Sequence, residues 1–243
     1  MSLIPSASEG LCSLNKLKRM KNPSATKTWQ PVSHYFVLKT VLDCLRKRKV
    51  EVEDSWHTTA CDDTRYFGLL HLKYGEADTE YKTCVGIRNS LDKKFAVGLA
   101  WGSQVIVCSN LMFVGEVVVG RRHTPGITED LPLRVNLGMD QLFAFGDTQK
   151  DRIEWLRSVE FLRDYPGIDH ILIQAMDKGL ISSSMIGRVL AKWRESDEPE
   201  GSMWELLNAF TYTLRGSVRT DNLINRTIRL QEEVLLPYCD TIG

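Results

Sequence analysis

The order of the predicted elements is the feature that most constrains this fold. A block of predicted strands covers residues 50–122, and predicted helices follow over residues 131–236. Strands are recognised by apolar residues that recur every second position, and helices by apolar residues that recur every three or four. Strands gathered in one part of the chain pair with their sequence neighbours, which favours an antiparallel sheet. We therefore predict an α+β fold, with an antiparallel meander of about six strands followed by a C-terminal set of helices.

The individual strands and turns are predicted from alternation and from turn-forming residues. Phe95 to Trp101 is a clear example, because large side chains alternate there with Ala and Gly. The strands are predicted at 50–59, 65–73, 81–89, 95–101, 104–108 and 112–120, with turns at 61–64 and 102–103.

Two helix starts carry a specific signal. Ser33 can cap a helix that runs to about Arg48, and Ser202 with Glu205 forms a Ser-x-x-Glu capping box. Further helices are predicted at 150–163, 169–178, 182–193 and 221–235.

The first 30 residues differ from the rest. They are punctuated by Pro, Ser, Asn and Gly and show no sustained apolar face. We predict a basic, poorly ordered N-terminal extension over residues 1–30, and a single α+β domain over residues 31–243. A chain of 243 residues fits one large domain or two small ones.

The formal net charge of zero hides an asymmetry along the chain. Residues 1–50 contain ten Lys and Arg against two acidic residues, a net charge of +8, so the remainder carries −8. A basic segment can attract phosphate backbones, or it can be a solvated leader. The candidate phosphate contacts in it are Lys16, Lys18, Arg19 and Lys21.

The six cysteines are scattered, and no two lie closer than 17 residues. A zinc ribbon and a thioredoxin-like motif both need a Cys-x-x-Cys pair, so they are excluded. Met1 to Gly10 lacks the basic start and apolar run of a signal peptide. We expect free thiols in a reducing cytoplasm, and no membrane span, because no apolar run approaches about 20 residues.

Two polar groups in the strand block are candidate sites. The first group comprises Arg88, Asn89, Ser90 and Asp92, together with Asn110. These side chains can bind a phosphate or the edge of a base. Alternatively, they form a turn in which Arg88 pairs with Asp92. The second is Arg121, Arg122 and His123 at a strand end. Two guanidiniums beside an imidazole suit an anion site or a basic surface turn.

These motifs resemble those of a known family, the domain of unknown function 932 family, described as phage- and plasmid-like proteins. The resemblance rests on Gly86–Asp92, Val107–Leu111 and Arg122–Thr124, together with Pro31–His34 and a C-terminal pattern. That pattern is Trp204, Asn208, Ala209 and Thr211, and Phe67-Gly68 follows the first hairpin as in the family. One position departs, because Leu91 stands where family members often have His.

The resemblance implies a protein of a phage, prophage or plasmid, located in the cytoplasm of the bacterial host. It implies no reaction and no cofactor. The chain also has no Walker sequence, no Gly-x-Gly-x-x-Gly and no Gly-x-Ser-x-Gly, and its histidines lack metal-binding spacing. We therefore expect no metal site and no catalytic residue.

Three function classes follow. We rank first a non-enzymatic accessory protein that binds DNA or RNA through the basic extension and Arg121 to His123. The alternatives are a protein that inhibits a host defence or replication factor, and an enzyme that acts on nucleotides around Arg88, Asp92 and His123. The sequence does not indicate an oligomeric state.

Overall fold

The computed structural model describes residues 10–74, 81–105, 111–119, 123–215, 217 and 220–242. The sequence predicted one domain after residue 30, whereas the chain forms two compact units. The first unit comprises residues 1–109 and 113–146, and the second comprises residues 110–112 and 147–243.

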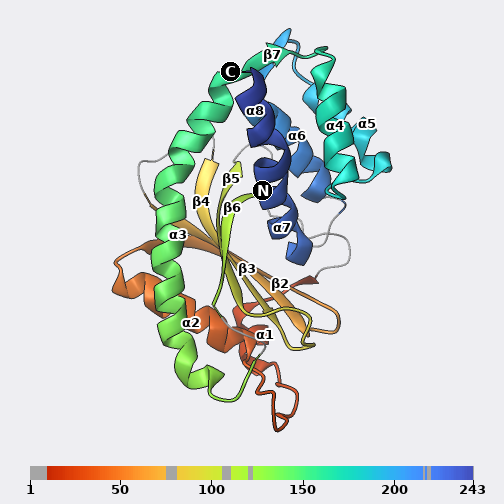
Figure 1. Cartoon of the computed structure of the whole chain (residues 1–243). Coiled ribbons are helices and arrows are strands. Elements are labelled where there is room, and N and C mark those ends of the chain that lie inside the picture. Colours follow the sequence, from red (N-terminus) through yellow and green to blue (C-terminus); the bar gives the residue numbers. More distant parts are fainter. Residues whose placement is uncertain are drawn as a thin grey trace. The chain divides into compact units, whose positions relative to one another are not determined.

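The first unit is built on a six-stranded meander sheet, in which every strand lies beside its neighbour in sequence (Figure 1). The pairs from β1 to β5 are all antiparallel, which confirms the predicted antiparallel sheet. Short connections favour this order from β2 to β6, whereas α1 and α2 lie between β1 and β2 in the chain. The strands are β1 (Gly10–Leu11), β2 (Glu51–Ala60), β3 (Arg65–Lys73), β4 (Tyr81–Ser90), β5 (Gly98–Val105) and β6 (Leu111–Val118).

Helix α2 (His34–Lys47) packs on one face of this sheet. The Ser33 side chain accepts a hydrogen bond from the Phe36 amide at 3.1 Å, which confirms the predicted N-cap. Val37, Val41 and Leu45 form the buried stripe of the helix. They share one core with alternate residues of β3, β4 and β5 and with residues 127–142 of the next helix.

Residues 10–30 belong to the fold rather than to a poorly ordered extension. β1 pairs with the end of β2, and α1 (Leu14–Arg19) follows, capped by Ser13. Cys12, Leu17 and Trp29 are all buried. A helix of six residues is marginal by itself in water, so α1 depends on this packing.

The predicted turn at Gly102-Ser103 is wrong. Both residues lie inside β5, paired with Cys84 and Thr83 of β4. Glycine is favoured in turns but also where another group approaches the backbone closely. At Gly86, on the paired strand, a Cβ would stand 2.8 Å from the Phe113 ring.

The second unit is mainly helical, as predicted for the C-terminal part. Helix α5 packs on α6, and the π-helical turn η1 contacts α4, α6, α7 and α8. A small antiparallel pair of strands, β7 and β8, accompanies the helices. Its elements are β7 (Glu160–Leu162), α4 (Gly167–Asp177), α5 (Ser183–Trp193), β8 (Glu200–Ser202), α6 (Met203–Arg215), α7 (Thr220–Leu230), η1 (Gln231–Leu235) and α8 (Leu236–Ile242).

The capping box at the start of α6 is confirmed and extended. The Glu205 carboxylate accepts the Ser202 amide at 2.8 Å and the Arg163 guanidinium at 2.8 Å. Arg163 also donates to the carbonyls of Trp193 and Glu198, and its guanidinium lies 4.6 Å from the Trp193 ring centroid. This guanidinium therefore ties together β7, α5 and α6.

Two predicted helices have different limits. The helix predicted at 150–163 is the end of α3 (Ile127–Ser158), which accommodates Pro132 because Ile127, Leu131 and Val135 are buried on one side. The helix predicted at 221–235 continues through a π turn and past Pro237 to Ile242. In both cases burial outweighs the helix-breaking tendency of proline.

None of the helices in the described ranges is long and apolar enough to cross a membrane. Within the same ranges, Cys12, Cys44, Cys61, Cys84 and Cys239 are not joined to one another in disulfides. Cys108 lies outside the described residues.

The burial of α1 leads to a test. Leu17 is 1% exposed, so Leu17→Ala should lower the free energy of unfolding by about 2–5 kcal/mol. Leu14→Ala on the same helix is the control, because Leu14 is 43% exposed. Denaturant titrations of both variants make the comparison, and equal midpoints would show that α1 is not part of the core.

The core of the second unit can be tested on one helix. Trp204 and Phe210 are both buried, so replacing either with Ala should destabilise the fold by roughly 3–5 kcal/mol. Tyr212→Ala is the matched control, because that ring is 42% exposed on α6. Thermal melts that place all three variants near wild type would contradict the packing.

Candidate functional site

Three of the predicted phosphate contacts, Lys16, Lys18 and Arg19, lie on α1, and Lys21 follows it directly. Lys18, Arg19 and Lys21 are exposed, and the Lys18 ammonium stands 5.3 Å from the centroid of the Tyr35 ring. Lys16 differs, because its ammonium donates to the Asp63 carboxylate at 2.8 Å. Lys16 is therefore already neutralised within the protein, and the other three remain available.

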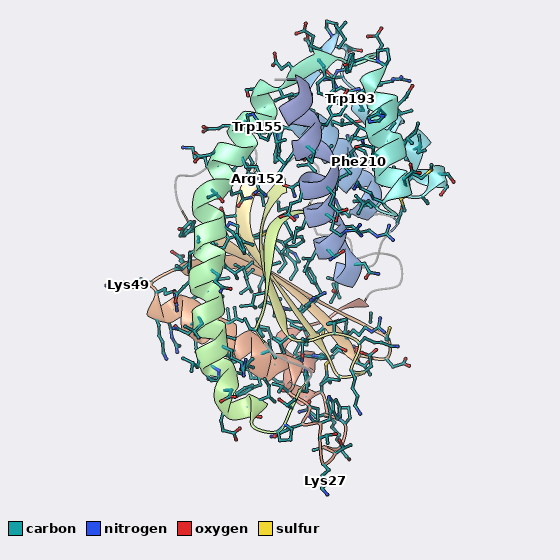
Figure 2. The ribbon with its side chains drawn as sticks, in the orientation of Figure 1. Lys27, Lys49, Arg152, Trp155, Trp193 and Phe210 are labelled. Carbon is teal, nitrogen blue, oxygen red and sulfur yellow. The ribbon has the colours of Figure 1, made fainter. Side chains whose placement is uncertain are left out.

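The loop that follows α1 carries Lys27. Thr26 and Trp29 form an isolated bridge, which closes a tight turn around Lys27. Figure 2 shows Lys27 at the outer end of this loop. Lys93, in the segment between β4 and β5, places its ammonium 4.6 Å from the Trp29 ring centroid. The loop and this segment are therefore neighbours.

We call the resulting group the basic surface. Its members are exposed cations on α1, on the following loop and on the segment after β4. None of them makes an ion pair with the residues that the structure describes. They are Lys18, Arg19, Lys21, Lys27, Lys93 and Lys94.

Beneath the basic surface lies a buried hydrogen-bond network centred on Asn89, near the end of β4. Its amide donates to the Val32 carbonyl and to His34 Nδ1, both at 2.9 Å. Its amide oxygen accepts from His123 Nε2 at 2.9 Å. The Val32 amide donates to His123 Nδ1 at 3.0 Å, and His34 Nε2 donates to the Asp63 carbonyl at 3.0 Å. We call these five residues the Asn89 network.

The network determines the protonation state of both imidazoles. His123 Nδ1 accepts from a backbone amide, so its proton must be on Nε2. His34 Nδ1 accepts from the Asn89 amide, so its proton is also on Nε2. Both rings are therefore neutral, with each nitrogen in one hydrogen bond. Neither can take up a proton without losing one of these bonds.

Burial of the two imidazoles also favours their neutral form. His34 and His123 are each 1% exposed, and Asn89 is fully buried. Burial, followed by the nearby His34, lowers the pKa of His123 to about 4. Burial also lowers the pKa of His34, although the Asp63 carbonyl opposes the effect. The network is thus most stable with both rings uncharged.

The predicted partner of Asp92 is wrong. Arg65 of β3, rather than Arg88, donates to the Asp92 carboxylate at 2.7 Å, and Ser90 donates to its other oxygen. Burial raises the pKa of Asp92, but the hydrogen bonds from Ser90 and Arg65 lower it below its usual value overall. Arg88 lies with its guanidinium 5.3 Å from the Phe95 ring centroid. The predicted Arg88–Asp92 cluster is therefore divided.

The β2–β3 turn has an unusual backbone. Cys61, Asp62 and Asp63 all have positive φ, at 54°, 54° and 60°. Left-handed conformation in non-glycine residues costs about 1–2 kcal/mol each. The turn is held by Asp63, whose carboxylate accepts from Lys16 and Thr59 and whose carbonyl accepts from His34. Hydrogen bonds from Lys16 and then Thr59 lower the pKa of Asp63.

Three residues of the predicted sites lie outside the described residues: Asn110, Arg121 and Arg122. His123 is described, but it belongs to the buried network and not to the surface. Sequence reasoning missed the role of His34, which it used only in the Pro31–His34 motif and in the search for metal-binding spacing. No local signal could reveal it, because its partners are more than 25 residues away.

Over the part of the chain that the structure describes, no three His, Cys, Asp or Glu side chains gather as a metal site would require. No family model matches the chain. Searches of curated proteins and of solved structures also find no match. The resemblance to the phage- and plasmid-like family therefore stays an expectation.

The neutral histidines predict a pH dependence. In the unfolded chain they protonate near pH 6.5, whereas in the folded protein His123 resists protonation to about pH 4. The unfolded state thus binds more protons in this window. For His123, stability is complete above about pH 6.5 and falls as the pH is lowered towards 4, by up to about 1.4 kcal/mol per pH unit, and the lowered pKa of His34 acts in the same direction.

Urea titrations between pH 7.5 and 4.5 measure this effect. His123→Gln should flatten the slope, whereas His170→Gln, at an exposed position on α4, should leave it unchanged. An identical slope in wild type and His123→Gln would show that His123 does not titrate as the network requires.

Proposed function

We propose that this chain is a non-enzymatic protein that binds nucleic acid through its basic surface. One observation carries the proposal. Six exposed Lys and Arg side chains have no acidic partner among the described residues, and they lie on elements that contact one another or follow directly in the chain. Cations without an intramolecular partner are free to neutralise phosphates.

The charge elsewhere in the first unit is arranged differently. Lys39 and Arg46 of α2 both pair with Asp43, and Lys73 and Lys82 pair with Glu51 and Glu53. In these places opposite charges cancel locally. The basic surface differs because six cations without an acidic partner among the described residues lie on it, and such a local excess of one sign is what attracts a polyanion.

The resemblance to phage- and plasmid-like proteins supports the same direction. It implies that the protein is encoded by a mobile genetic element and acts in a bacterial cytoplasm, where DNA and RNA are both present. An accessory role fits a surface that contacts phosphates without reading base edges.

We rank the nucleotide-acting enzyme last. Of the three residues it would use, Asp92 is paired with Arg65, and both ring nitrogens of His123 are hydrogen-bonded inside the protein. A catalytic acid or base needs a group that can exchange a proton with substrate.

A host-protein partner remains the second candidate, because Leu133 and Leu137, one turn apart on α3, are 64% and 57% exposed.

The test uses the double variant Lys21→Ala/Lys27→Ala. Each phosphate contact adds about 0.9 to the log–log salt slope on duplex DNA, so the variant should lower the slope by about 2. Fluorescence anisotropy with labelled single- and double-stranded oligonucleotides at several salt concentrations measures it.

The matched control removes the same charge elsewhere. Lys47→Ala with Lys49→Asn neutralises two exposed cations at the C-terminal end of α2, and Asn suits the positive φ of residue 49. Figure 2 shows Lys49 well separated from Lys27. The control should keep the wild-type slope. If wild type binds neither oligonucleotide at about 50 mM salt, the nucleic-acid proposal fails and the host-protein partner becomes the better hypothesis.

A further inference from the structure

We propose that Asn89 is the positioning residue of the basic surface: its buried amide holds the loop that carries Lys21 and Lys27, although Asn89 itself contacts no ligand. This inference rests on the proposed function and adds to it the group that presents the binding surface. It is carried by the hydrogen bonds of the Asn89 network and by the attachment of the loop to them.

The loop between α1 and α2 is attached mainly at its C-terminal end. The Val32 backbone is held on both sides, because its carbonyl accepts from Asn89 and its amide donates to His123. Two residues earlier, the Gln30 amide donates to the His123 carbonyl at 2.6 Å. All of these contacts lead, directly or through His123, to the Asn89 amide.

The Trp29 ring is buried and stacks on His123, with the ring centroids 6.1 Å apart, and the remaining attachments of the loop are weaker or exposed. Asn22 donates to the Pro31 carbonyl at 3.3 Å, which closes the loop on itself without fixing it to the sheet. Gln30 reaches Thr128 at 3.3 Å. Lys93 stacks on Trp29 as a cation–π contact at the surface. Such exposed contacts contribute little, whereas a buried and satisfied network is rigid.

Asn89 is suited to this role because it lies on a strand in the interior of the sheet. Asn89 is paired with Tyr66 of β3, and the preceding residue Arg88 is paired with Gly98 of β5, so the position of its Cα is defined independently of the loop. An amide is also the side chain that can donate twice and accept at the same time. Neither Ala nor Asp can reproduce all three of its bonds.

Asp at this position gives a specific signature. A carboxylate cannot donate to His34 Nδ1 or to the Val32 carbonyl, so the bond to His34 is lost while that ring is neutral. Protonation of His34 would turn Nδ1 into a donor and restore it. The charged and titratable groups around His34 are the carboxylate introduced at position 89, Asp63, which pairs with Lys16, and His123. The ring of Tyr66 also lies close, with its centroid 5.3 Å from that of His34. The added carboxylate favours the protonated ring.

The experiment measures oligonucleotide affinity of Asn89→Ala and Asn89→Asp by anisotropy at pH 8 and pH 6, below the melting temperature of each variant. At pH 8 both should bind about tenfold more weakly than wild type, the size of effect expected when a hydrogen-bonded contact is lost. At pH 6 Asn89→Asp should recover only in part, because the bond to His34 returns while the Val32 carbonyl stays without its donor, and Asn89→Ala should not recover.

Val85→Ala is the matched control, since Val85 is fully buried on the same strand but lies in the apolar core. It should lower the melting temperature and leave affinity unchanged. If Val85→Ala weakens binding equally, the effect is one of general stability and the positioning role is overturned. If both Asn89 variants bind like wild type while Lys21→Ala/Lys27→Ala does not, positioning fails and the proposed function stands. If wild type does not bind, both fail.

Discussion

The side-chain amide of Asn89 is the interaction on which the arrangement of the first unit's surface depends. It is fully buried, and it connects the segment before α2, the start of α2 and the residue His123 that precedes α3. A buried amide without partners would cost about 1–3 kcal/mol for each unpaired group. The three segments must therefore meet at this point if the sheet is to fold with Asn89 inside. The direction of every bond in the network follows from this requirement, and so does the neutrality of the two imidazoles.

The need to satisfy buried polar groups also separates the side chains that are hydrogen-bonded inside the protein from those that can bind a partner. His34, Asn89 and His123 look like candidate chemistry in the sequence, but their hydrogen bonds are used within the protein. Lys16 is likewise occupied by Asp63. The groups left for a partner are simple cations above the network, which suit contact with phosphate better than proton transfer. The loop between α1 and α2 thus links the two features, because the Asn89 network holds its C-terminal end and its exposed residues are basic.

Local sequence patterns predicted the elements correctly where those elements depend on contacts between residues close in sequence. Ser33 caps α2 and Ser202 pairs with Glu205, because a cap and its partner are three residues apart. The strand pattern at 65–73 matches β3 without change. Predictions were wrong where burial opposed local preference. Pro132 lies within α3 and Gly102 within β5, since packing against the core outweighs the tendency of these residues to break regular structure.

The sequence by itself determined the α+β class, the separation of strands from helices and the excess of positive charge in the first 50 residues. These properties are sums over local patterns, and each can be counted along the chain. Only the tertiary structure decided which cations remain unpaired and that His34, Asn89 and His123 form one network. These residues are up to 89 positions apart in sequence, between His34 and His123. Local periodicity carries no information on which distant side chains meet, because that depends on how the sheet and its covering helices pack.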